Sequence, residues 1–251
     1  MGNLFDLCGK TAIVTGAATG LGEGMALGLA KAGADIMIVA HSTQNNTLDK
    51  IKAMGRNAFQ ISVDLSVQSS VKEVIDATLD NFGKIDILVN NAGIIRRTPA
   101  IDYSEKDWDD VMAVNAKTLF FLSQAAARDM MKRGKGKIIN IASLLSFSGG
   151  INVPAYAASK GAVAQITKAL ANEWASKGIN INAIAPGYMV TNNTENLRKD
   201  TARTKSISDR IPADRWGAPE DMAGPVVFLA SSASDYVNGH VLLVDGGWMA
   251  R

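Results

Sequence analysis

Residues 11–22 read Thr-Ala-Ile-Val-Thr-Gly-Ala-Ala-Thr-Gly-Leu-Gly, a short apolar run that passes directly into a glycine-rich turn. The pattern that follows, residues 23–32, has the spacing of a helix and stops at Gly33. Glycines in such a turn allow close backbone approach, so that amides at the helix start can hold a diphosphate. The order of strand, turn and helix favours a dinucleotide site, and the plainer alternative is a tight turn without a ligand.

Apolar runs rich in Ile and Val recur along the chain and alternate with helical patterns. They occupy residues 11–15, 35–40, 59–63, 85–90, 137–142, 180–185 and 241–244. Continuous apolar runs suit strands covered on both faces, and right-handed crossovers join such strands in parallel. We therefore expect an α/β fold over residues 1–251: a single-domain, Rossmann-type, doubly wound parallel sheet with helices on both faces.

Residues 186–219 form the least regular part of the chain, too long and too polar for an ordinary connection. We expect short helices there, over the carboxyl ends of the strands, where an open α/β sheet binds its ligand. A mobile lid that covers the substrate is the favoured interpretation. A fixed surface insertion is the alternative.

The bulk properties of the 251 residues indicate a small-molecule partner. The formal net charge of +2 is too small to indicate nucleic acid or an anionic membrane as the main partner. No apolar stretch approaches the roughly 18 residues of a membrane span, and the first residues do not resemble a signal peptide. Because Cys8 is the only cysteine, we expect a reducing, cytoplasmic setting.

Two further loops are expected on the same edge of the sheet as the glycine turn. Asp64 follows the third predicted strand, and the sequence Asn-Asn-Ala-Gly at residues 90–93 follows the fourth. Asp64 can accept a hydrogen bond from an adenine amino group, or it can cap the helix that follows.

The candidate reaction centre begins with Tyr156 and Lys160, four residues apart in a segment whose Pro154 suits a helix start. A neighbouring ammonium lowers the pKa of a tyrosine and makes it a usable proton carrier. Ser143 ends the fifth predicted strand and can orient a substrate oxygen, while Asn115 lies within a predicted helix at 107–131. Taken singly, these residues also suit a surface pair, a cap and a stray polar residue.

Taken together, the motifs are similar to those of the classical short-chain dehydrogenase/reductase family, over essentially the whole chain. The resemblance rests on residues 15–22, residues 90–93, Asn115, Ser143, Tyr156 with Lys160, Pro186-Gly187 with Thr191, and residues 245–247. It implies that Tyr156 is the acid/base, that Lys160 also holds the nicotinamide ribose, that Ser143 positions the substrate oxygen and that Asn115 supports a water relay.

The resemblance also implies a nicotinamide cofactor and a homotetramer, to which the apolar stretch 237–249 can contribute. The residues expected to contact the cofactor are Gly16, Thr19, Gly20, Leu21, Gly22, His41, Asp64, Leu65, Asn91, Ala92, Gly93, Tyr156, Lys160, Pro186, Gly187 and Thr191.

Within the family, residues 90–97, 104–111, 183–193, 209–217 and 230–251 resemble the dehydrogenases of 2-deoxy-D-gluconate and 2-dehydro-3-deoxy-D-gluconate. A sugar acid needs a cation for its carboxylate, and Arg96 and Arg97 directly follow the fourth-strand loop. We expect one of them to bind the substrate together with Ser143 and Tyr156. A solvated basic turn is the plainer interpretation, and Arg210 and Arg215 are rival partners.

The choice between NAD and NADP rests on the end of the second strand. An NAD site usually has an acid there, whereas this chain has His41 and Ser42, which tolerate a ribose phosphate. The narrower resemblance implies NAD, so we expect NAD and leave NADP open.

Three other functions fit parts of the sequence. The first is another short-chain reductase, such as a 3-oxoacyl-carrier-protein reductase or a broad sugar dehydrogenase, because the catalytic residues are shared. The second is a non-catalytic, cofactor-binding sensor, which the presence of all four catalytic residues disfavours. A serine hydrolase is disfavoured because no Gly-x-Ser-x-Gly elbow occurs. With two histidines and one cysteine we expect no metal site.

Overall fold

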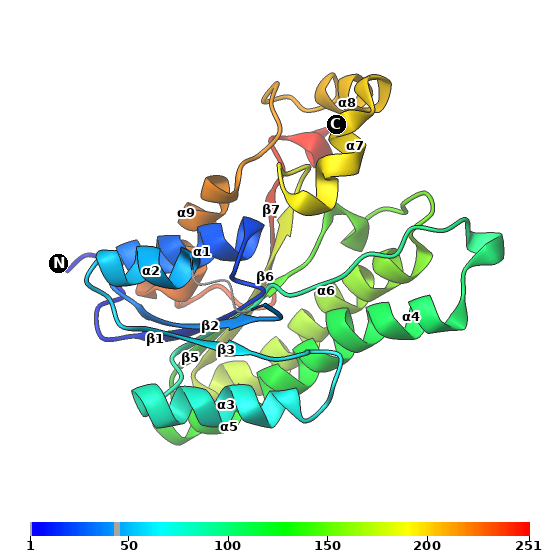
Figure 1. Ribbon diagram of the computed structural model, residues 1–251. Helices are drawn as coiled ribbons and strands as arrows, with labels where there is room; N and C mark the ends of the chain where they lie inside the picture. Colours follow the sequence, from blue (N-terminus) through cyan, green and yellow to red (C-terminus); the bar gives the residue numbers. More distant parts are fainter. Residues whose placement is uncertain (1, 43–45) are drawn as a thin grey trace.

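The computed structural model describes residues 2–42 and 46–251, and in this part of the chain seven parallel strands form one sheet (Figure 1). The strand order is β3-β2-β1-β4-β5-β6-β7. This confirms the predicted doubly wound, Rossmann-type α/β domain. The strands are β1 (Thr11–Thr15), β2 (Asp35–Ala40), β3 (Ala58–Ser62), β4 (Ile87–Asn90), β5 (Gly136–Ile141), β6 (Ile179–Pro186) and β7 (Val241–Val244).

Strands β1, β2 and β7 have the predicted bounds, and the others differ by one or two residues at their ends. The largest difference is at β4, which was expected to begin at Ile85. The backbone N–H of Ile85 instead donates to the carboxylate of Asp129, 3.1 Å away, so the ladder of β4 starts later.

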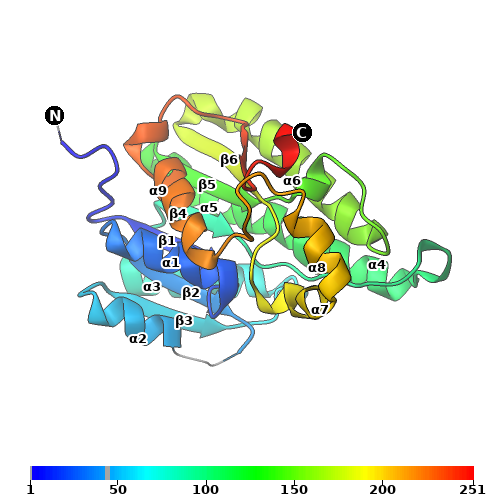
Figure 2. The same cartoon turned by 90° about the horizontal axis from the view of Figure 1, so that it is seen from above.

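Helices cover both faces of the sheet (Figures 1 and 2). Alternate side chains of β1 enter different cores: Ala12 and Val14 pack with α1 and α9, and Ile13 packs with α3, α5 and α6. The helices are α1 (Gly20–Lys31), α2 (Asn46–Ala53), α3 (Ser70–Phe82), α4 (Glu105–Met112), α5 (Leu119–Arg133), α6 (Pro154–Trp174), α7 (Glu195–Lys199), α8 (Thr201–Ser208) and α9 (Ala223–Ala230).

The single helix predicted at residues 107–131 is interrupted. Helix α4 ends at Met112, a π-helical segment spans Ala113–Thr118, and α5 follows. Hydrophobic periodicity cannot reveal such a segment, because it adds only one residue to the turn. The prediction of a continuous α-helix was therefore wrong at this point.

The strand order reverses between β1 and β4, which are neighbours in the sheet. The loops that follow these strands leave the same edge in opposite directions and open a crevice there. The short helices α7 and α8 of the irregular segment lie above this edge (Figure 1). The sheet therefore places its crevice where the sequence predicted a ligand site.

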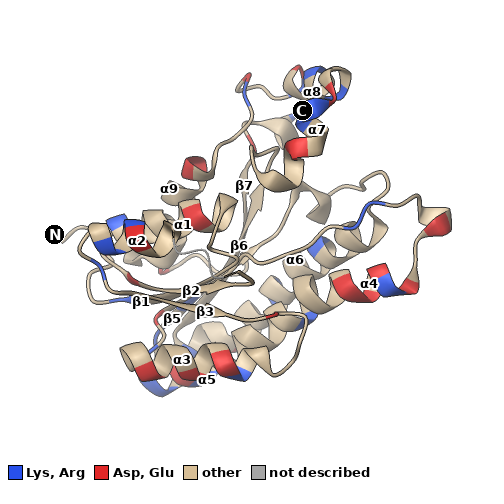
Figure 3. Cartoon of the chain, in the orientation of Figure 1, with Lys and Arg blue, Asp and Glu red and all other residues tan. Residues whose placement is uncertain are grey.

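The surface carries both signs of charge. Acidic and basic residues mix on the outer faces of α2, α3 and α4 (Figure 3), in keeping with the small net charge. Among the described residues, no helix combines the length and the apolar character needed to cross a membrane.

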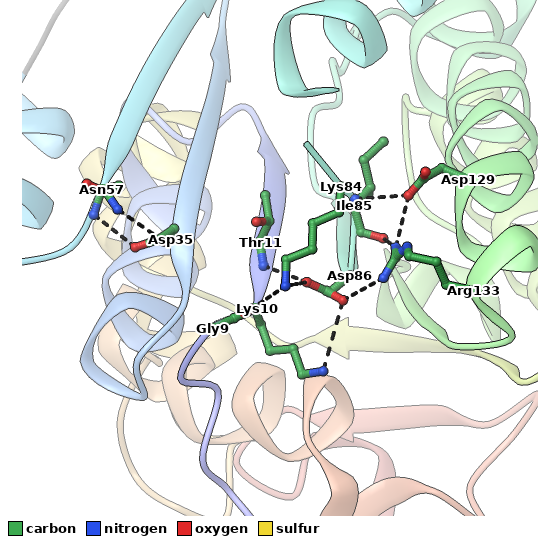
Figure 4. A network of polar contacts seen from close by, with 10 residues as sticks. All are labelled: Gly9, Lys10, Thr11, Asp35, Asn57, Lys84, Ile85, Asp86, Asp129 and Arg133. Carbon is green, nitrogen blue, oxygen red and sulfur yellow. Dashed lines mark hydrogen bonds and ion pairs between the residues drawn. The ribbon is translucent and has the colours of Figure 1, made fainter. Parts of the chain in front are cut away.

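The opposite, amino edge of the sheet is held by the carboxylate of Asp86, just before β4 (Figure 4). Asp86 is 6% exposed and accepts from the backbone N–H of Thr11 at 3.0 Å and from Arg133 Nη1 at 2.9 Å. The ammonium groups of Lys84 and Lys10 lie 3.2 and 4.0 Å away. Burial raises the pKa of Asp86, but the hydrogen bonds from Thr11 and Arg133 outweigh it and lower the pKa below its usual value.

We predict that Asp86→Asn lowers the free energy of unfolding by about 3 kcal/mol at pH 7, because it removes the charge that compensates three cations. Since the folded pKa of Asp86 is depressed, its contribution is present above the unfolded pKa and is lost as the pH falls through the folded pKa. The difference between the two proteins in urea unfolding should therefore shrink towards acid pH.

The control is Asp76→Asn, which breaks an exposed pair with Lys72 and should change stability by less than about 0.5 kcal/mol. Equal losses in the two variants would contradict the role given to Asp86.

Candidate active site

The turn after β1 depends on glycine at two points. Gly16 has φ +65°, and a Cβ atom on Gly22 would lie 2.1 Å from the carbonyl oxygen of Gly16. Thr19 precedes α1 in an extended conformation, and within the described residues its side chain does not cap the helix. The first N–H groups of α1 are therefore available to an anion such as a diphosphate.

The loop after β4 is bonded directly to this turn. The side-chain amide of Asn91 donates to the carbonyl oxygens of Thr15 at 2.9 Å and Gly16 at 3.2 Å. In return, the Thr15 hydroxyl accepts from the backbone N–H groups of Asn91 and Ala92, both at 2.9 Å. Asn91 thus shapes the turn through its amide, and residues 91–93 line the crevice.

Tyr156 and Lys160 lie on the first turns of α6, which begins at Pro154. The Lys160 Nζ atom is 5.7 Å from the centroid of the Tyr156 ring and donates to the carbonyl oxygen of Ile141, at the end of β5, at 2.5 Å. Lys160 is 4% exposed, and its burial lowers its pKa to about 8. Ser143, two residues beyond Ile141, lines the same cavity as Tyr156 and lowers the pKa of its phenol. Strand β5 and helix α6 therefore bring the three predicted residues together.

The prediction that Lys160 lowers the pKa of Tyr156 was wrong for this structure. Burial raises the pKa of Tyr156, and the hydrogen bond with Ser143 and the charge of Arg97 only partly oppose it. The phenol is therefore protonated at neutral pH.

Asn115 lies in the π-helical segment, is 1% exposed and does not line the crevice. Its Oδ1 atom accepts from the N–H of Ile94 at 2.8 Å, and its Nδ2 atom donates to the carbonyl of Ile94 at 3.0 Å. Nδ2 also donates to Ser159 Oγ at 3.1 Å, and Ser159 donates to the carbonyl of Tyr156 at 2.8 Å. Asn115 therefore ties the loop after β4 to the helix that carries Tyr156.

A cavity of about 1020 Å³ opens along this edge, between the glycine turn, α6 and the segment of α7 and α8. Most of the residues expected to bind the cofactor or to react line it. They are Gly16, Thr19, Gly20, Leu21, Gly22, Asn91, Ala92, Gly93, Ser143, Tyr156, Lys160, Pro186, Gly187 and Thr191.

Three predicted cofactor residues, His41, Asp64 and Leu65, lie after β2 and β3 and do not line this cavity. The Asp64 carboxylate accepts from the backbone N–H of Ser66 at 2.8 Å, and this bond lowers its pKa. It therefore closes a turn. Helix α3 has Ser69 as its N-cap residue, so Asp64 does not cap that helix.

The four arginines considered for the substrate separate into two groups. Arg97 and Arg210 line the cavity. Arg96 is turned towards α4, where its guanidinium lies 3.5 Å from Asp107 and 3.7 Å from Asp110. Arg215 pairs with Asp221 at 2.7 Å beside a separate, smaller cavity. The candidates Arg96 and Arg215 are therefore engaged elsewhere.

Every charged residue that lines the large cavity, among those the structure describes, is a cation. They are Arg97, Lys160, Arg203, Arg210 and Arg251. Sequence reasoning missed Arg203 and Arg251, as well as Trp248, because they belong to no motif and reach the site only through the folding of the lid and the C-terminal segment. The wall of the cavity is suited to an anionic ligand.

Comparison with known proteins agrees with this geometry. A family model described as Enoyl-(Acyl carrier protein) reductase matches residues 16–249. The 2-dehydro-3-deoxy-D-gluconate 5-dehydrogenase of Dickeya dadantii (strain 3937) is 59% identical over 250 residues, which cover 99% of both chains.

Two crystal structures share the fold over nearly their whole length. One, from Agrobacterium tumefaciens with bound NADP, is provisionally assigned as a 2-deoxy-D-gluconate 3-dehydrogenase; it is 55% identical, covers 100% of both chains and has a TM-score of 0.94. The other is a gluconate 5-dehydrogenase from Burkholderia cenocepacia J2315 in complex with NADP and tartrate. It is 41% identical, covers 99% of this chain and 98% of its own, and has a TM-score of 0.94. With the glycine turn and the cluster of Ser143, Tyr156 and Lys160, these matches show that the chain belongs to the short-chain dehydrogenase/reductase family.

Proposed function

We propose that the chain is an NAD(P)-dependent dehydrogenase that interconverts a secondary alcohol and a ketone of a deoxy sugar acid. The substrate is 2-deoxy-D-gluconate or 2-dehydro-3-deoxy-D-gluconate, as in the names of the relatives. The observation that carries the proposal is the cavity in which Tyr156 and Ser143 lie together and every charged lining residue described is a cation. Such a wall favours a substrate that carries a carboxylate.

The residues present fit a nicotinamide dinucleotide. The crevice at the glycine turn is too narrow for a Cβ atom on Gly22, and the start of α1 offers N–H groups for a diphosphate. Lys160, Gly187 and Thr191 line the cavity; in the proposal Lys160 would hold the nicotinamide ribose, and Gly187 and Thr191 would meet the nicotinamide carboxamide. Bound NAD(P) supplies the acceptor or donor of the hydride.

Tyr156 carries the proton in the proposed reaction. During reduction its protonated phenol donates to the ketone oxygen, and during oxidation the phenolate accepts the proton of the substrate hydroxyl. Ser143 donates a hydrogen bond that holds the reacting oxygen. Because burial raises the pKa of Tyr156, the free site is set for proton donation at neutral pH. Arg97 and Ser143 favour the phenolate that oxidation needs.

Asn115 and Ser159 position this centre. Their hydrogen bonds connect the loop after β4 with the carbonyl of Tyr156, and thereby fix the start of α6. A water relay at Asn115 remains part of the proposal, as does substrate contact by Arg97. Arg96 makes no substrate contact in this proposal, because its guanidinium pairs with α4.

The proposal also includes a lid, an assembly and a compartment. Residues 186–219 move to admit and cover the substrate, which their position over the carboxyl edge supports.

The chain forms a homotetramer in this proposal. The edge strand β7, with Leu243 40% exposed, supports an interface there. The cytoplasm is the proposed location, supported by the single cysteine.

The first test compares NAD and NADP with 2-deoxy-D-gluconate, 2-dehydro-3-deoxy-D-gluconate and an acetoacetyl thioester. We expect turnover of a sugar acid that exceeds turnover of the thioester. The comparison of cofactors is needed because the resemblance implies NAD, whereas the related crystal structures contain NADP. Activity confined to the thioester would overturn the substrate, and tight cofactor binding without any turnover would favour a sensor.

Tyr156→Phe should lower kcat by about 10²- to 10⁴-fold, because it removes the oxygen that carries the proton. Cofactor affinity, measured by calorimetry, should stay nearly unchanged. Tyr236→Phe is the control, since Tyr236 is fully exposed. Near-normal turnover by the Tyr156 variant would refute the assignment.

Lys160→Met should abolish turnover and weaken cofactor binding, yet stabilise the free protein. Burial lowers the folded pKa of Lys160 to about 8 from 10.5, so its charge costs about 3 kcal/mol at pH 7. Losing the bond to Ile141 offsets about 1 kcal/mol of this. In the natural protein the cost falls as the pH rises from 8 to 10.5, because the unfolded state then binds more protons.

The excess stability of Lys160→Met should therefore be largest at pH 7 and fall to zero near pH 10, where the remaining cost of the charge equals the loss of the bond to Ile141, as thermal unfolding will show. Lys168→Met, an exposed change on the same helix, should have no such pH dependence. A variant less stable than the natural protein at pH 7 would contradict the cost assigned to the buried charge.

A further inference from the structure

Three arginines line the cavity from the lid and the C-terminal segment. They are Arg203, Arg210 and Arg251. Arg203 belongs to α8, Arg210 follows that helix, and Arg251 follows the short turn Trp248–Ala250. The guanidinium of Arg251 is engaged in holding the lid: its Nη2 and Nε atoms donate to the carbonyls of Asp209 at 2.7 Å and Arg210 at 3.2 Å.

The guanidinium of Arg210 is fixed in a different way. It stacks on the indole ring of Trp248, with its Cζ atom 4.0 Å from the ring centroid. Trp248 in turn packs against Tyr188, with ring centroids 4.7 Å apart, and Tyr188 follows β6 on the cavity wall. Stacking occupies the flat face of a guanidinium and leaves the N–H groups at its edge free to bind a carboxylate in the plane.

The backbone around this stack is also closely packed. Gly246 and Gly247 have φ +65° and +90°, and Cβ atoms there would lie 2.8 Å from Ile211 and 2.9 Å from Pro212. These glycines let the C-terminal segment lie directly against the residues that follow Arg210. Arg210 is therefore held by its ring partner, by its own carbonyl and by its neighbours in the chain, which is the preorganisation that a binding site requires.

We propose that Arg210 binds the substrate carboxylate and determines the preference for acids, while Arg97 acts at the reacting end beside Tyr156. This inference rests on the proposed function and divides the two cavity arginines that sequence reasoning left as rivals. Arg210 holds the far end of the molecule, so that the reacting carbon lies between Ser143 and Tyr156.

The charges around Tyr156 favour carboxylate binding by Arg210 over carboxylate binding by Arg97. Arg97 and Tyr156 line the same cavity, and the charge of Arg97 lowers the pKa of the phenol. A carboxylate on Arg97 would cancel that charge at the reaction centre and disfavour the phenolate. In a sugar acid that reacts at carbon 5, the carboxylate is four carbon–carbon bonds away from the reacting carbon, so a separate cation is needed at that distance. Among the described lid cations, Arg210 is the one with an aromatic partner to hold its guanidinium.

The test compares a sugar acid that reacts at carbon 5 with its neutral amide, for example 2-dehydro-3-deoxy-D-gluconate and 2-dehydro-3-deoxy-D-gluconamide, in the natural enzyme and in variants. Arg210→Gln should raise KM for the acid by about 10- to 100-fold, the loss expected for a charge-assisted bond, with little change in kcat or in the constants for the amide. Arg210→Lys keeps the charge but loses the planar stack, and should recover only part of the preference.

Arg97→Gln should instead lower kcat for both compounds and shift the rise of oxidation rate to higher pH, while the preference for acid over amide remains. Arg96→Gln is the matched control, because its guanidinium pairs with α4 outside the cavity. It should match the natural enzyme in both respects.

The outcomes distinguish a failure of the proposed function from a failure of the role given to Arg210. If the natural enzyme turns over no sugar acid, the proposed function fails. If it does so, but Arg210→Gln keeps the full preference for the acid, or Arg97→Gln abolishes that preference, the role of Arg210 is overturned. Arg97 and Arg210 are both exposed and line the cavity, so their replacement should leave the fold intact. Thermal unfolding of each variant checks this.

Discussion

The contact between the glycine turn after β1 and the loop after β4 is the constraint on which the rest of the site depends. Gly22 packs so closely on the carbonyl of Gly16 that no side chain fits, and the Asn91 amide bonds the two loops together. This contact lies at the point where the strand order reverses, so it determines the width of the crevice. Loops from β5 and β6 then have a fixed edge against which Ser143, Pro186 and Gly187 are placed.

The two edges of the sheet use buried charge in opposite ways. At the amino edge, Asp86 is surrounded by three cations and the Thr11 amide, and its pKa is lowered. At the carboxyl edge, Lys160 is buried against a carbonyl oxygen, and its pKa falls. The first arrangement stabilises the folded chain, whereas the second destabilises it in return for a cation within reach of Tyr156. A loss of stability at a reaction centre, offset by stabilising contacts elsewhere in the fold, is common in enzymes.

Much of the fold could be predicted because buried parallel strands are apolar on both faces, and every strand run from residue 11 to residue 244 was found. The β1 turn and the pair of Tyr156 and Lys160 were equally accessible, since their spacing reflects local geometry. Contacts between residues far apart in the sequence could not be predicted in this way. Nothing in the order Arg96-Arg97 shows that the first turns towards Asp107 and the second into the cavity. The raised pKa of Tyr156 likewise follows from burial, which a sequence does not display.

The π-helical segment at Ala113–Thr118 changes the direction in which the side chains of α5 point relative to those of α4. An α-helix turns by about 100° per residue, so the extra residue rotates α5 relative to α4. With it, Asn115 faces Ile94 and Ser159 while Leu122, Ala126 and Met130 face the sheet. Deleting a single residue there would set these two requirements against each other: α5 could keep its apolar stripe on the core or Asn115 could keep its partners. The π-helical segment therefore allows Asn115 to keep its hydrogen bonds while the apolar side chains of α5 stay in the core.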